Sequence, residues 1–479
     1  MNLDKAMAIL AEHCRSSGHR GPVTDQIRTE LLALMQGERS PLLASEEHAA
    51  IKAWLHAEFG SRADPAGTMY EATLGYTVSV ADGGVTVHKE RRRHRATGAY
   101  YTQETVVRYM VARARQYAPW ASAVVDPACG SGAFLTQVRQ EFADVPMRLV
   151  GFDADPTALE LCRHSIPAAE LHAVDALTHD LPGGFDLCLG NPPYISSGLR
   201  GAAPHNPQYH AELKRRFPAT AQYKVNTYPL FIERGLSLLR DGGVLGFIVP
   251  DSFLSGRYFE GLRRTILRHT LLELTLLCDD FWEHGRVGHS VILFVRKEPS
   301  PANHLVNIAL CPSVADLACC EPAAMPVAEI TWGSLLRFRL IPDLVTRRFI
   351  RQMEAAPGIR PLSDFVRTYS GLIARHGQAG LLRSTNPHLS GPWGRLLRSG
   401  KEIDRYRLCW AGEEVCLRPE LIKSGGHLAY YQNPKLLLRQ TADALRAVYD
   451  DTGIYCLNNI HLLIPRSPVV SLRALLGLI

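Results

Sequence analysis

The fold is indicated by one stretch of the chain, VVDPACGSGAFL at residues 124–135. In this stretch a short apolar strand leads into a Gly-x-Gly turn, and the turn leads into a helical segment. Glycines let the backbone turn tightly and approach a ligand at the carboxyl end of a strand, where doubly wound sheets bind their cofactors. The stretch therefore predicts the first strand, turn and helix of such a sheet.

Outward from this stretch, short apolar runs alternate with helical segments. We expect strands at 123–126, 149–153, 171–174, 186–189, 244–249, 273–277 and 291–295. Helical spacing fills most of the intervals, for example at 155–164 and 228–239. This alternation predicts a parallel sheet covered by helices on both faces. The last two strands have no helix between them, which indicates an antiparallel hairpin at the edge of the sheet.

The chain is expected to contain four regions. Residues 1–95 are predicted to form a mainly helical extension with a hairpin around Asp82, and residues 96–300 form the sheet. Residues 301–360 are expected to connect it to a C-terminal domain at 361–479. The predicted fold class is α/β, a Rossmann-like doubly wound sheet with an N-terminal helical extension and a C-terminal α+β domain.

Charge is unevenly distributed along the 479 residues. The net charge is +6, and residues 361–479 carry 15 Lys and Arg against 9 Asp and Glu, so they hold the whole excess. A basic C-terminal region on a neutral body indicates a polyanionic partner.

The sequence argues against a membrane protein, a secreted protein and a protein held together by disulfides or zinc. No apolar run reaches the ~20 residues that a bilayer span requires, and the N-terminus lacks a basic region followed by an apolar one. We therefore expect a cytoplasmic protein without a membrane partner. The 11 cysteines include no CxxC pair, which predicts reduced thiols with no disulfide framework, structural zinc or other metal.

Carboxylates stand at three consecutive strand ends, at Asp126, Asp153 and Asp175. Asp126 would repel a phosphate, and the third glycine of a dinucleotide motif is replaced by Leu135. Asp126 instead suits a positively charged cofactor such as S-adenosyl-L-methionine, while Asp153 can accept hydrogen bonds from its ribose and Asp175 from its adenine. The alternatives are a glycine turn with only a steric role and a helix N-cap at Asp175. The residues expected to contact this cofactor are Asp126, Ala128, Gly130, Gly132, Asp153, Asp175 and Asn191.

The fourth strand delivers the segment NPPY at residues 191–194. The two prolines fix the backbone and remove two N–H donors. The Asn191 side-chain oxygen and the Pro192 carbonyl can then both accept from one –NH2 group, which favours a tetrahedral nitrogen with an available lone pair. Tyr194 offers a face for a planar substrate. A rigid turn that only caps the strand is the alternative.

With this motif the chain resembles the gamma class of N6-adenine DNA methyltransferases, the TaqI type with a C-terminal target-recognition domain. Further segments that resemble this class are GAYYTQETVV at 98–107, YKVNTYPLFIE at 223–233, DGGVLGFIVP at 241–250, HSVILF at 289–294 and, more loosely, KLLLRQT at 435–441 with LNNIH at 457–461.

The resemblance implies that residues 96–300 are an S-adenosylmethionine-dependent methyltransferase domain and that residues 361–479 bind double-stranded DNA, with a truncated end. A flipped-out adenine would be methylated at N6, in a restriction-modification or phage-defence setting. Tyr101 and Thr102 would close over the cofactor, and Phe281 would stack on the second face of the adenine. We expect a monomer that works beside a separate restriction endonuclease or defence-system subunit.

Three other functions are alternatives. Protein-glutamine N5-methyltransferases use the same NPPY loop, because an amide nitrogen has the same delocalised lone pair. An N4-cytosine DNA methyltransferase and a non-catalytic DNA-binding subunit are the other two. The basic C-terminal region and the Tyr-Tyr-Thr segment at 100–102 favour DNA, and Asn at the first position of the loop favours adenine.

Overall fold

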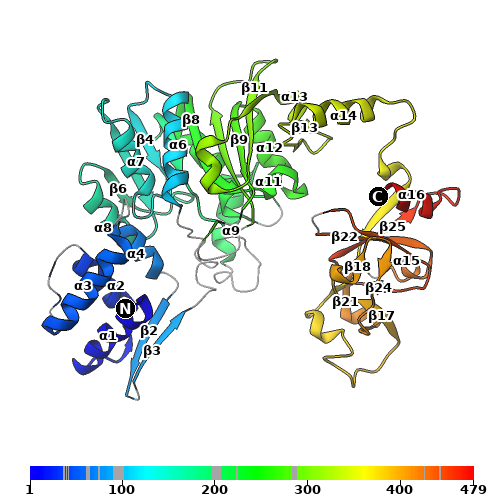
Figure 1. The fold of residues 1–479 in the computed structure, drawn as a ribbon, viewed down its shortest axis with the longest axis horizontal. Coiled ribbons are helices and arrows are strands. Elements are labelled where there is room, and N and C mark those ends of the chain that lie inside the picture. The colour runs from blue at the N-terminus through cyan, green and yellow to red at the C-terminus, as the bar shows by residue number, and fades with distance from the viewer. Residues whose placement is uncertain are drawn as a thin grey trace. The chain divides into compact units, whose positions relative to one another are not determined.

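The computed structural model describes residues 1–35, 38, 40, 43–60, 65–73, 76–82, 84–89, 102–195, 206–222, 225–279, 281–282, 288–425, 427–441 and 444–479. The chain divides into two compact units, Met1–Arg347 and Arg348–Ile479 (Figure 1). Each unit is described by itself.

The N-terminal part of the first unit contains the predicted helices and hairpin. Its elements are α1 (Leu3–Ser16), β1 (Gly21–Pro22), α2 (Thr24–Met35), α3 (Ser45–Phe59), α4 (Pro65–Thr73), β2 (Tyr76–Ala81) and β3 (Gly84–Lys89). Strands β2 and β3 pair antiparallel, as the sequence predicts. The core of this region includes Ala158 and Leu161, which lie on the helix after the second strand of the large sheet. The extension therefore packs against the sheet domain.

Among the described residues, the largest sheet has nine strands in the order β12-β11-β9-β10-β8-β7-β4-β5-β6 (Figure 1). The strands are β4 (Ala123–Asp126), β5 (Arg148–Asp153), β6 (Glu170–Ala173), β7 (Phe185–Gly190), β8 (Leu239–Pro250), β9 (Thr270–Leu277), β10 (Ser290–Arg296), β11 (Leu305–Cys311) and β12 (Ala323–Pro326). From β6 to β8 all neighbours are parallel. All seven predicted strands are present, and the predicted fold class is confirmed.

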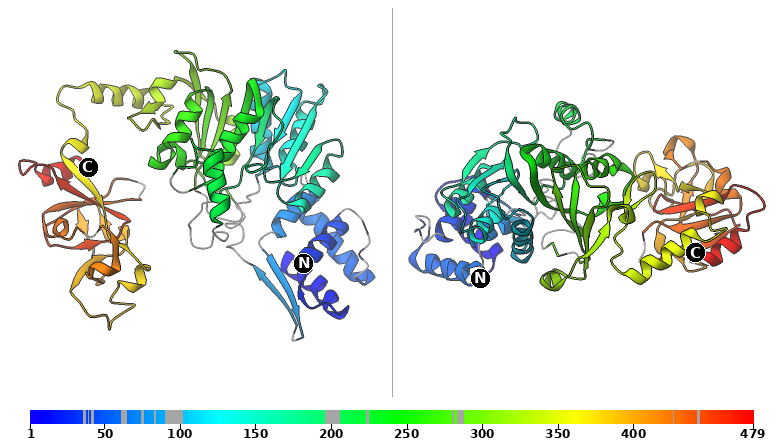
Figure 2. Two further views of the ribbon diagram at one scale, coloured as in Figure 1. Left: turned by 180° about the vertical axis from the view of Figure 1, so that it is seen from behind. Right: turned by 90° about the horizontal axis from the view of Figure 1, so that it is seen from above.

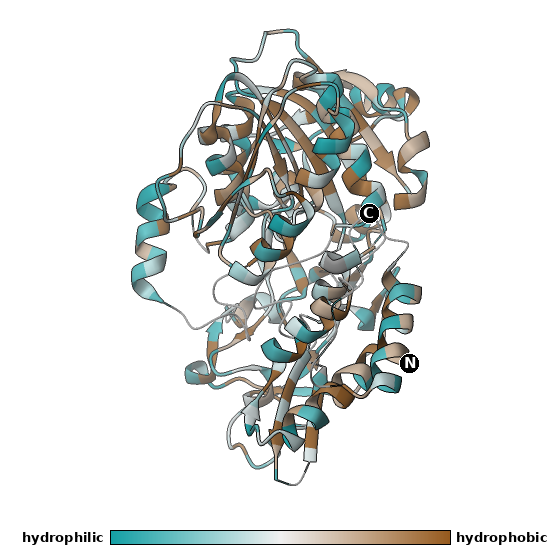
Figure 3. Ribbon diagram, turned by 90° about the vertical axis from the view of Figure 1, so that its left-hand side faces the viewer, coloured by the Kyte–Doolittle hydropathy of each residue, from teal (hydrophilic) through white to brown (hydrophobic). Residues whose placement is uncertain are grey.

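Helices cover both faces of this sheet (Figure 2). They are α6 (Glu104–Tyr117), α7 (Ala133–Glu141), α8 (Pro156–Ser165), α9 (Pro207–Arg216), α10 (Thr227–Leu238), α11 (Ser252–Ser255) and α12 (Glu260–Leu267). Side chains alternate along the strands: Leu187 and Leu189 join the core with α6, α7 and α8, whereas Cys188 joins the core with α10 and α12. Because both faces are buried, the central strands are mostly apolar, as the brown colour along much of the sheet in Figure 3 shows.

The antiparallel pairing of β9 and β10 is confirmed, but their predicted place at the edge of the sheet is wrong. Strand β11 pairs in parallel with β9, and β12 pairs with β11. Both strands come from residues 301–360, where the sequence indicated only connecting structure. Val306 and Ile308 of β11 are fully buried in the sheet core, so these strands complete it.

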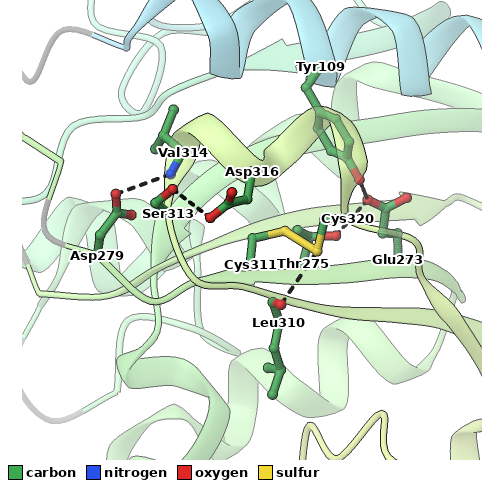
Figure 4. Close-up of a disulfide and its surroundings, with 10 residues drawn as sticks. All are labelled: Tyr109, Glu273, Thr275, Asp279, Leu310, Cys311, Ser313, Val314, Asp316 and Cys320. Carbon is green, nitrogen blue, oxygen red and sulfur yellow. Dashed lines mark hydrogen bonds between the residues drawn. A yellow bond between two sulfur atoms is a disulfide. The ribbon is translucent and has the colours of Figure 1, made fainter.

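The prediction of reduced thiols is wrong for one pair, because Cys311 and Cys320 form a disulfide with Cα atoms 6.0 Å apart (Figure 4). Cys311 ends β11, and the 3-10 helix η2 (Val314–Cys319) returns the chain to it. In the same loop the Val314 N–H donates to the Asp279 carboxylate at 3.1 Å. Sequence spacing did not reveal this pair, because the turn that brings the two sulfurs together depends on the sheet.

A buried carboxylate fastens α6 to the sheet. Glu273 on β9 is fully buried and accepts hydrogen bonds from Tyr109 at 2.8 Å, from Arg113 Nε at 2.7 Å and from Tyr117 at 2.7 Å. Figure 4 shows the Tyr109 hydroxyl pointing at this carboxylate from α6. A buried charge is tolerated only when it is paired and hydrogen-bonded, so these three side chains hold the helix in one position.

We predict that Glu273→Ala lowers the free energy of unfolding by about 3 kcal/mol, because Arg113 would lose its buried partner. Urea unfolding followed by circular dichroism measures this change. Glu170→Ala is the matched control, since Glu170 pairs with Arg148 on the surface and such pairs contribute less than about 1 kcal/mol. Equal losses in the two variants would contradict the anchoring role of Glu273.

The first unit continues beyond the sheet with short elements. These are α13 (Val327–Ile330), β13 (Thr331–Trp332), β14 (Arg337–Phe338) and the start of α14 (Leu344–Ala355). Strands β13 and β14 form a hairpin that packs against α11 through the rings of Phe338 and Phe253.

The second unit contains many short strands and few helices, which agrees with the predicted α+β class. They are β15 (Val366–Ser370), β16 (Ile373–Ala374), β17 (Trp393–Leu397), β18 (Ile403–Asp404), β19 (Arg407–Leu408), β20 (Glu414–Cys416), β21 (Ile422–Ser424), α15 (Ala429–Gln432), β22 (Lys435–Arg439), β23 (Ala447–Asp450), β24 (Tyr455–Cys456), β25 (Ile460–Pro465) and α16 (Leu472–Leu478). Its main sheet has the order β15-β25-β22-β23. In the part of the chain that the structure describes, none of the helices has the length and apolar character needed to cross a bilayer.

Candidate active site

The predicted site residues come from neighbouring strand ends at one edge of the sheet. Strand β4 pairs in parallel with both β5 and β7, with Asp126 beside Gly151 and Val125 beside Cys188. Parallel strands place their carboxyl ends at the same edge. The sheet therefore brings together Asp126, Asp153 and Asn191, which the sequence places 27 and 38 residues apart.

The Gly-x-Gly turn between β4 and α7 needs glycine for its backbone angles. Gly130 has a φ of 52° and Gly132 a φ of 96°, in the left-handed region that favours glycine. The Gly130 N–H donates to the Asp153 carboxylate at 2.8 Å, which ties the turn to the end of β5. A Cβ at position 132 would lie 2.5 Å from the Cys162 sulfur, so Gly132 also allows α8 to pack closely. The Ser131 hydroxyl oxygen is buried in this turn without a partner among the described residues, which suits a polar ligand there.

Asp126 is a buried carboxyl group at the centre of the edge. Its side chain is 2% exposed and accepts the Ala128 N–H at 3.0 Å. Gly190, the last residue of β7, packs directly on it, since a Cβ at 190 would lie 2.6 Å from the carboxylate oxygen. Burial raises the pKa of Asp126 from 3.8 to about 8. A cationic ligand would stabilise the ionised carboxylate, which fits the ammonium and sulfonium of S-adenosylmethionine.

The end of β5 is supported by a residue that the sequence did not indicate. Asp153 accepts the Asp155 N–H at 2.8 Å, and Asp155 caps α8 by accepting the Thr157 N–H at 2.9 Å. The hydroxyl of Tyr70, on α4, donates to Asp155 at 2.6 Å. The N-terminal extension thus contacts Asp155, which hydrogen-bonds Asp153, the residue proposed to bind the ribose. No local pattern around Tyr70 signals this contact, because it depends on how α4 packs on α8.

The Asp175 carboxylate, two residues after β6, accepts hydrogen bonds from two donors. One carboxylate oxygen accepts the Leu177 N–H at 2.9 Å, as in a turn or cap. The other accepts the Tyr209 hydroxyl at 2.9 Å, and Tyr209 comes from α9. Tyr209 was not among the predicted residues. It contacts the carboxylate that is proposed to accept from the adenine of the cofactor.

The NPPY loop is held in place by the start of α10. The Thr227 hydroxyl donates to the Pro193 carbonyl and accepts the Ile195 N–H, the latter at 2.9 Å. Tyr194 directs its hydroxyl to the Asn191 side-chain oxygen at 2.6 Å, with the Ile248 carbonyl of β8 at 3.0 Å. No donor among the described residues bonds to the Pro192 carbonyl. The loop therefore presents two oxygens in fixed positions.

Aromatic residues surround this loop. The Tyr194 ring meets the rings of Trp282 at 6.0 Å and Tyr228 at 6.2 Å, both edge to face. Phe281 packs on Trp282 with centroids 4.6 Å apart and is less buried than Trp282. The Phe281 carbonyl accepts from Gln103 at 3.0 Å. This contact brings the segment around Phe281 beside the residues that precede α6.

The segment predicted to cover the cofactor is described only in part. Thr102 is buried just before α6, whereas Tyr101 lies outside the described residues. Within those residues, no group of three or more His, Cys, Asp or Glu is arranged to hold a metal ion.

The raised pKa of Asp126 predicts a pH dependence of stability. Between pH 3.8 and about 8 the folded chain keeps a proton that the unfolded chain has released, so its stability falls as the pH rises. Asp126→Asn cannot lose this proton, and without added cofactor the variant should gain stability over the natural chain across that interval. Urea unfolding at several pH values measures the difference.

Asp186→Asn is a control that should change the stability in the opposite direction. Burial favours protonation of Asp186, but hydrogen bonds from Ser122, Ala123 and Arg240 outweigh it and lower the pKa of Asp186. This variant should lose stability at neutral pH. A stability difference for Asp126→Asn that does not change with pH would contradict the raised pKa.

Family models match two parts of the chain. Residues 160–280 match the Eco57I restriction-modification methylase, and residues 396–479 match the TaqI-like C-terminal specificity domain. These regions contain the NPPY loop and most of the second unit, which confirms the predicted resemblance and its cofactor, S-adenosyl-L-methionine.

Individual proteins agree with these matches. The chain is 36% identical over 207 residues to the type II methyltransferase M.TthHB8I of Thermus thermophilus, covering 42% of this chain and 46% of that protein. It is 25% identical over 182 residues to the type II methyltransferase M.CvrRI of a Paramecium bursaria Chlorella virus, covering 37% and 43%. The aligned part thus spans less than half the length of these relatives.

Solved structures share the fold at low identity. A DrdV–DNA complex aligns with 97% of this chain and 63% of its own, with a TM-score of 0.54 and 12% identity. The type IIL restriction-modification enzyme MmeI in complex with DNA aligns with 96% of this chain and 77% of its own, with a TM-score of 0.53 and 14% identity.

Proposed function

We propose that this chain, which carries the methylase region and the specificity domain of a TaqI-type restriction-modification methyltransferase, transfers a methyl group to N6 of adenine in double-stranded DNA. The observation that carries the proposal is the pair of fixed acceptors in the NPPY loop, the Asn191 side-chain oxygen and the Pro192 carbonyl. They stand at the edge of the sheet that also holds the buried Asp126 carboxylate.

S-adenosylmethionine, when bound, supplies an electrophilic methyl group on a positively charged sulfur. Asp126 would neutralise its positive charge, Asp153 would accept from its ribose and Asp175 from its adenine. Ala128, Gly130 and Gly132 would line the turn beneath it, and Tyr101 and Thr102 would cover its methionine end.

The two oxygens of the loop would hold the two N–H bonds of the adenine amine. This arrangement draws the nitrogen out of conjugation with the ring and directs its lone pair toward the methyl group. The Tyr194 hydroxyl has one proton, so it donates either to the Asn191 side-chain oxygen, which fixes that side chain, or to the Ile248 carbonyl. Thr227 keeps the loop from shifting while the substrate binds.

The adenine must leave the duplex, because its amine is paired and stacked inside it. Tyr194 would stack on one face of the flipped base and Phe281 on the other. Phe281 is the better candidate than Trp282, since Trp282 is buried and donates to Ser290 at 3.0 Å.

The second unit is proposed to read the DNA sequence. It holds arginines that stack on aromatic rings, Arg383 on Trp393 and Arg395 on Trp410, at 5.0 and 5.7 Å. Such pairs suit phosphate and base contacts. The setting would be restriction-modification or phage defence, with a monomer beside a separate endonuclease or defence-system subunit.

Two other substrates use the same loop chemistry. A glutamine amide in a protein is disfavoured by the match to a specificity domain over 396–479. Cytosine N4 differs from adenine N6 only in the ring that carries the amine, and Asn191 at the first position of the loop favours adenine.

The first test separates binding from transfer. We predict that Asn191→Ala loses nearly all methyl transfer to mixed-sequence duplex DNA, because one acceptor for the amine is gone, while its affinity for S-adenosylmethionine changes little. Labelled cofactor measures transfer, and calorimetry measures affinity. Label transferred to added protein instead of DNA would refute the proposal. If Asn191→Ala lost affinity for S-adenosylmethionine but not the transfer step, Asn191 would not be the acceptor for the amine.

The second test concerns the Tyr194 hydroxyl. Tyr194→Phe keeps the stacking face but removes a hydrogen bond worth about 1 kcal/mol, so kcat should fall about fivefold with little change in DNA affinity. Tyr194→Ala should lose far more, because it also removes the ring. Equal kcat values in the two variants would contradict a separate role for the hydroxyl.

A further inference from the structure

An exposed surface of arginine and aromatic residues lies on the first unit, outside the specificity domain. It is formed by Arg257 and Tyr258 of η1 (Arg257–Phe259) and by Trp332 and Arg337 of the β13-β14 hairpin. Tyr258 is 50% and Trp332 45% exposed. The Arg257 guanidinium lies 5.0 Å from the Tyr258 ring, and Arg337 lies 5.9 Å from the Trp332 ring.

The two halves of this surface are fixed to each other. Arg263 of α12 is fully buried and donates to the carbonyls of Phe253 at 2.6 Å and Gly256 at 2.8 Å. It also donates to the Leu335 carbonyl at the tip of the hairpin, at 2.9 Å. Arg337 itself donates to the Ser255 carbonyl at 3.0 Å. One buried guanidinium therefore holds the hairpin against the segment that carries Arg257.

The same surface is connected to the proposed catalytic loop. Tyr228 packs its ring against Tyr194 at 6.2 Å and against Phe259 at 5.7 Å, and its hydroxyl lies 2.9 Å from the Ser252 hydroxyl. Ser252 follows β8, which is parallel to β7 and ends at the same edge as Asn191. The surface therefore lies next to the catalytic edge of the sheet, and buried side chains connect the two.

Within the described residues, the charge of this surface is not paired. In the described part of the chain, neither Arg257 nor Arg337 forms an ion pair, whereas the neighbouring Arg264 pairs with Glu260 at 2.8 Å. A guanidinium that lies over a ring keeps its edge N–H groups directed outward, where a phosphate can accept them. Exposed aromatic rings beside such groups can pack on deoxyribose.

We propose that Arg257, Tyr258, Trp332 and Arg337 bind the phosphate backbone of the DNA duplex next to the target base, which rests on the proposed function in that the substrate is DNA. These contacts position the duplex over the catalytic edge and carry no sequence information. They would act alongside the specificity domain, from the unit that carries the chemistry.

The test is the salt dependence of duplex binding by the full chain. The double variant Arg257→Gln and Arg337→Gln should bind a mixed-sequence duplex at least about tenfold more weakly near 0.15 M salt. The slope of log affinity against log salt should fall by about 0.9 for each phosphate that is no longer neutralised, roughly 2 for the double variant. Fluorescence anisotropy at several salt concentrations measures both quantities.

Three further variants separate charge from folding. Arg264→Gln should leave the slope unchanged, because its charge is already paired. Arg337→Lys should keep the slope, since the charge remains, and Trp332→Ala should weaken binding without changing the slope. Cofactor affinity, which these surface changes should not alter, reports whether each variant is folded.

An unchanged slope in the double variant, or an equal loss in Arg264→Gln, would overturn the inference. If the natural chain methylates DNA while the double variant keeps its slope, this inference fails and the proposed function stands. If the double variant loses slope as predicted but the natural chain methylates only protein, the proposed function fails while the contact surface remains.

Discussion

The rest of the structure depends on the parallel pairing of β4 with β5 and β7, which forces the ends of these strands together. At that edge Gly190 packs directly on the buried Asp126 carboxylate, leaving no room for a side chain. This contact joins the cofactor turn to the NPPY loop, because Asn191 is the next residue along the chain. The proposed cofactor charge and the proposed substrate amine therefore meet at one place, and the two halves of the site are packed against each other.

Much of the fold and the site was predictable from local sequence. Asp126 and Asp153 end their strands, Asn191 directly follows β7 and Asp175 lies two residues past β6, so their place at the edge follows from a parallel sheet. Strands β11 and β12 were missed although Leu305–Cys311 is a largely apolar run, because their place in the sheet depends on the pairing of β11 with β9. Tyr70, Tyr209 and Thr227 were missed for the same reason, since each reaches the site from an element that is distant in sequence.

The distribution of charge has a different meaning once the structure is known. The net excess of positive charge lies in residues 361–479, which fits a domain that holds DNA. The rest of the chain, residues 1–360, is neutral overall, yet it gathers Arg257 and Arg337 beside exposed rings near the catalytic edge. A neutral total therefore does not exclude a local site for phosphate. We propose that the specificity domain selects the sequence and that the catalytic unit holds the backbone beside the base that it modifies.

The fixed oxygens of the NPPY loop are proposed to act on the amine of adenine in duplex DNA. The most direct measurement is nucleoside analysis by mass spectrometry of duplex DNA incubated with the chain and isotopically labelled S-adenosylmethionine. The label is expected in N6-methyladenine and in no other nucleoside. Label in N4-methylcytosine would contradict the assignment of adenine as the target.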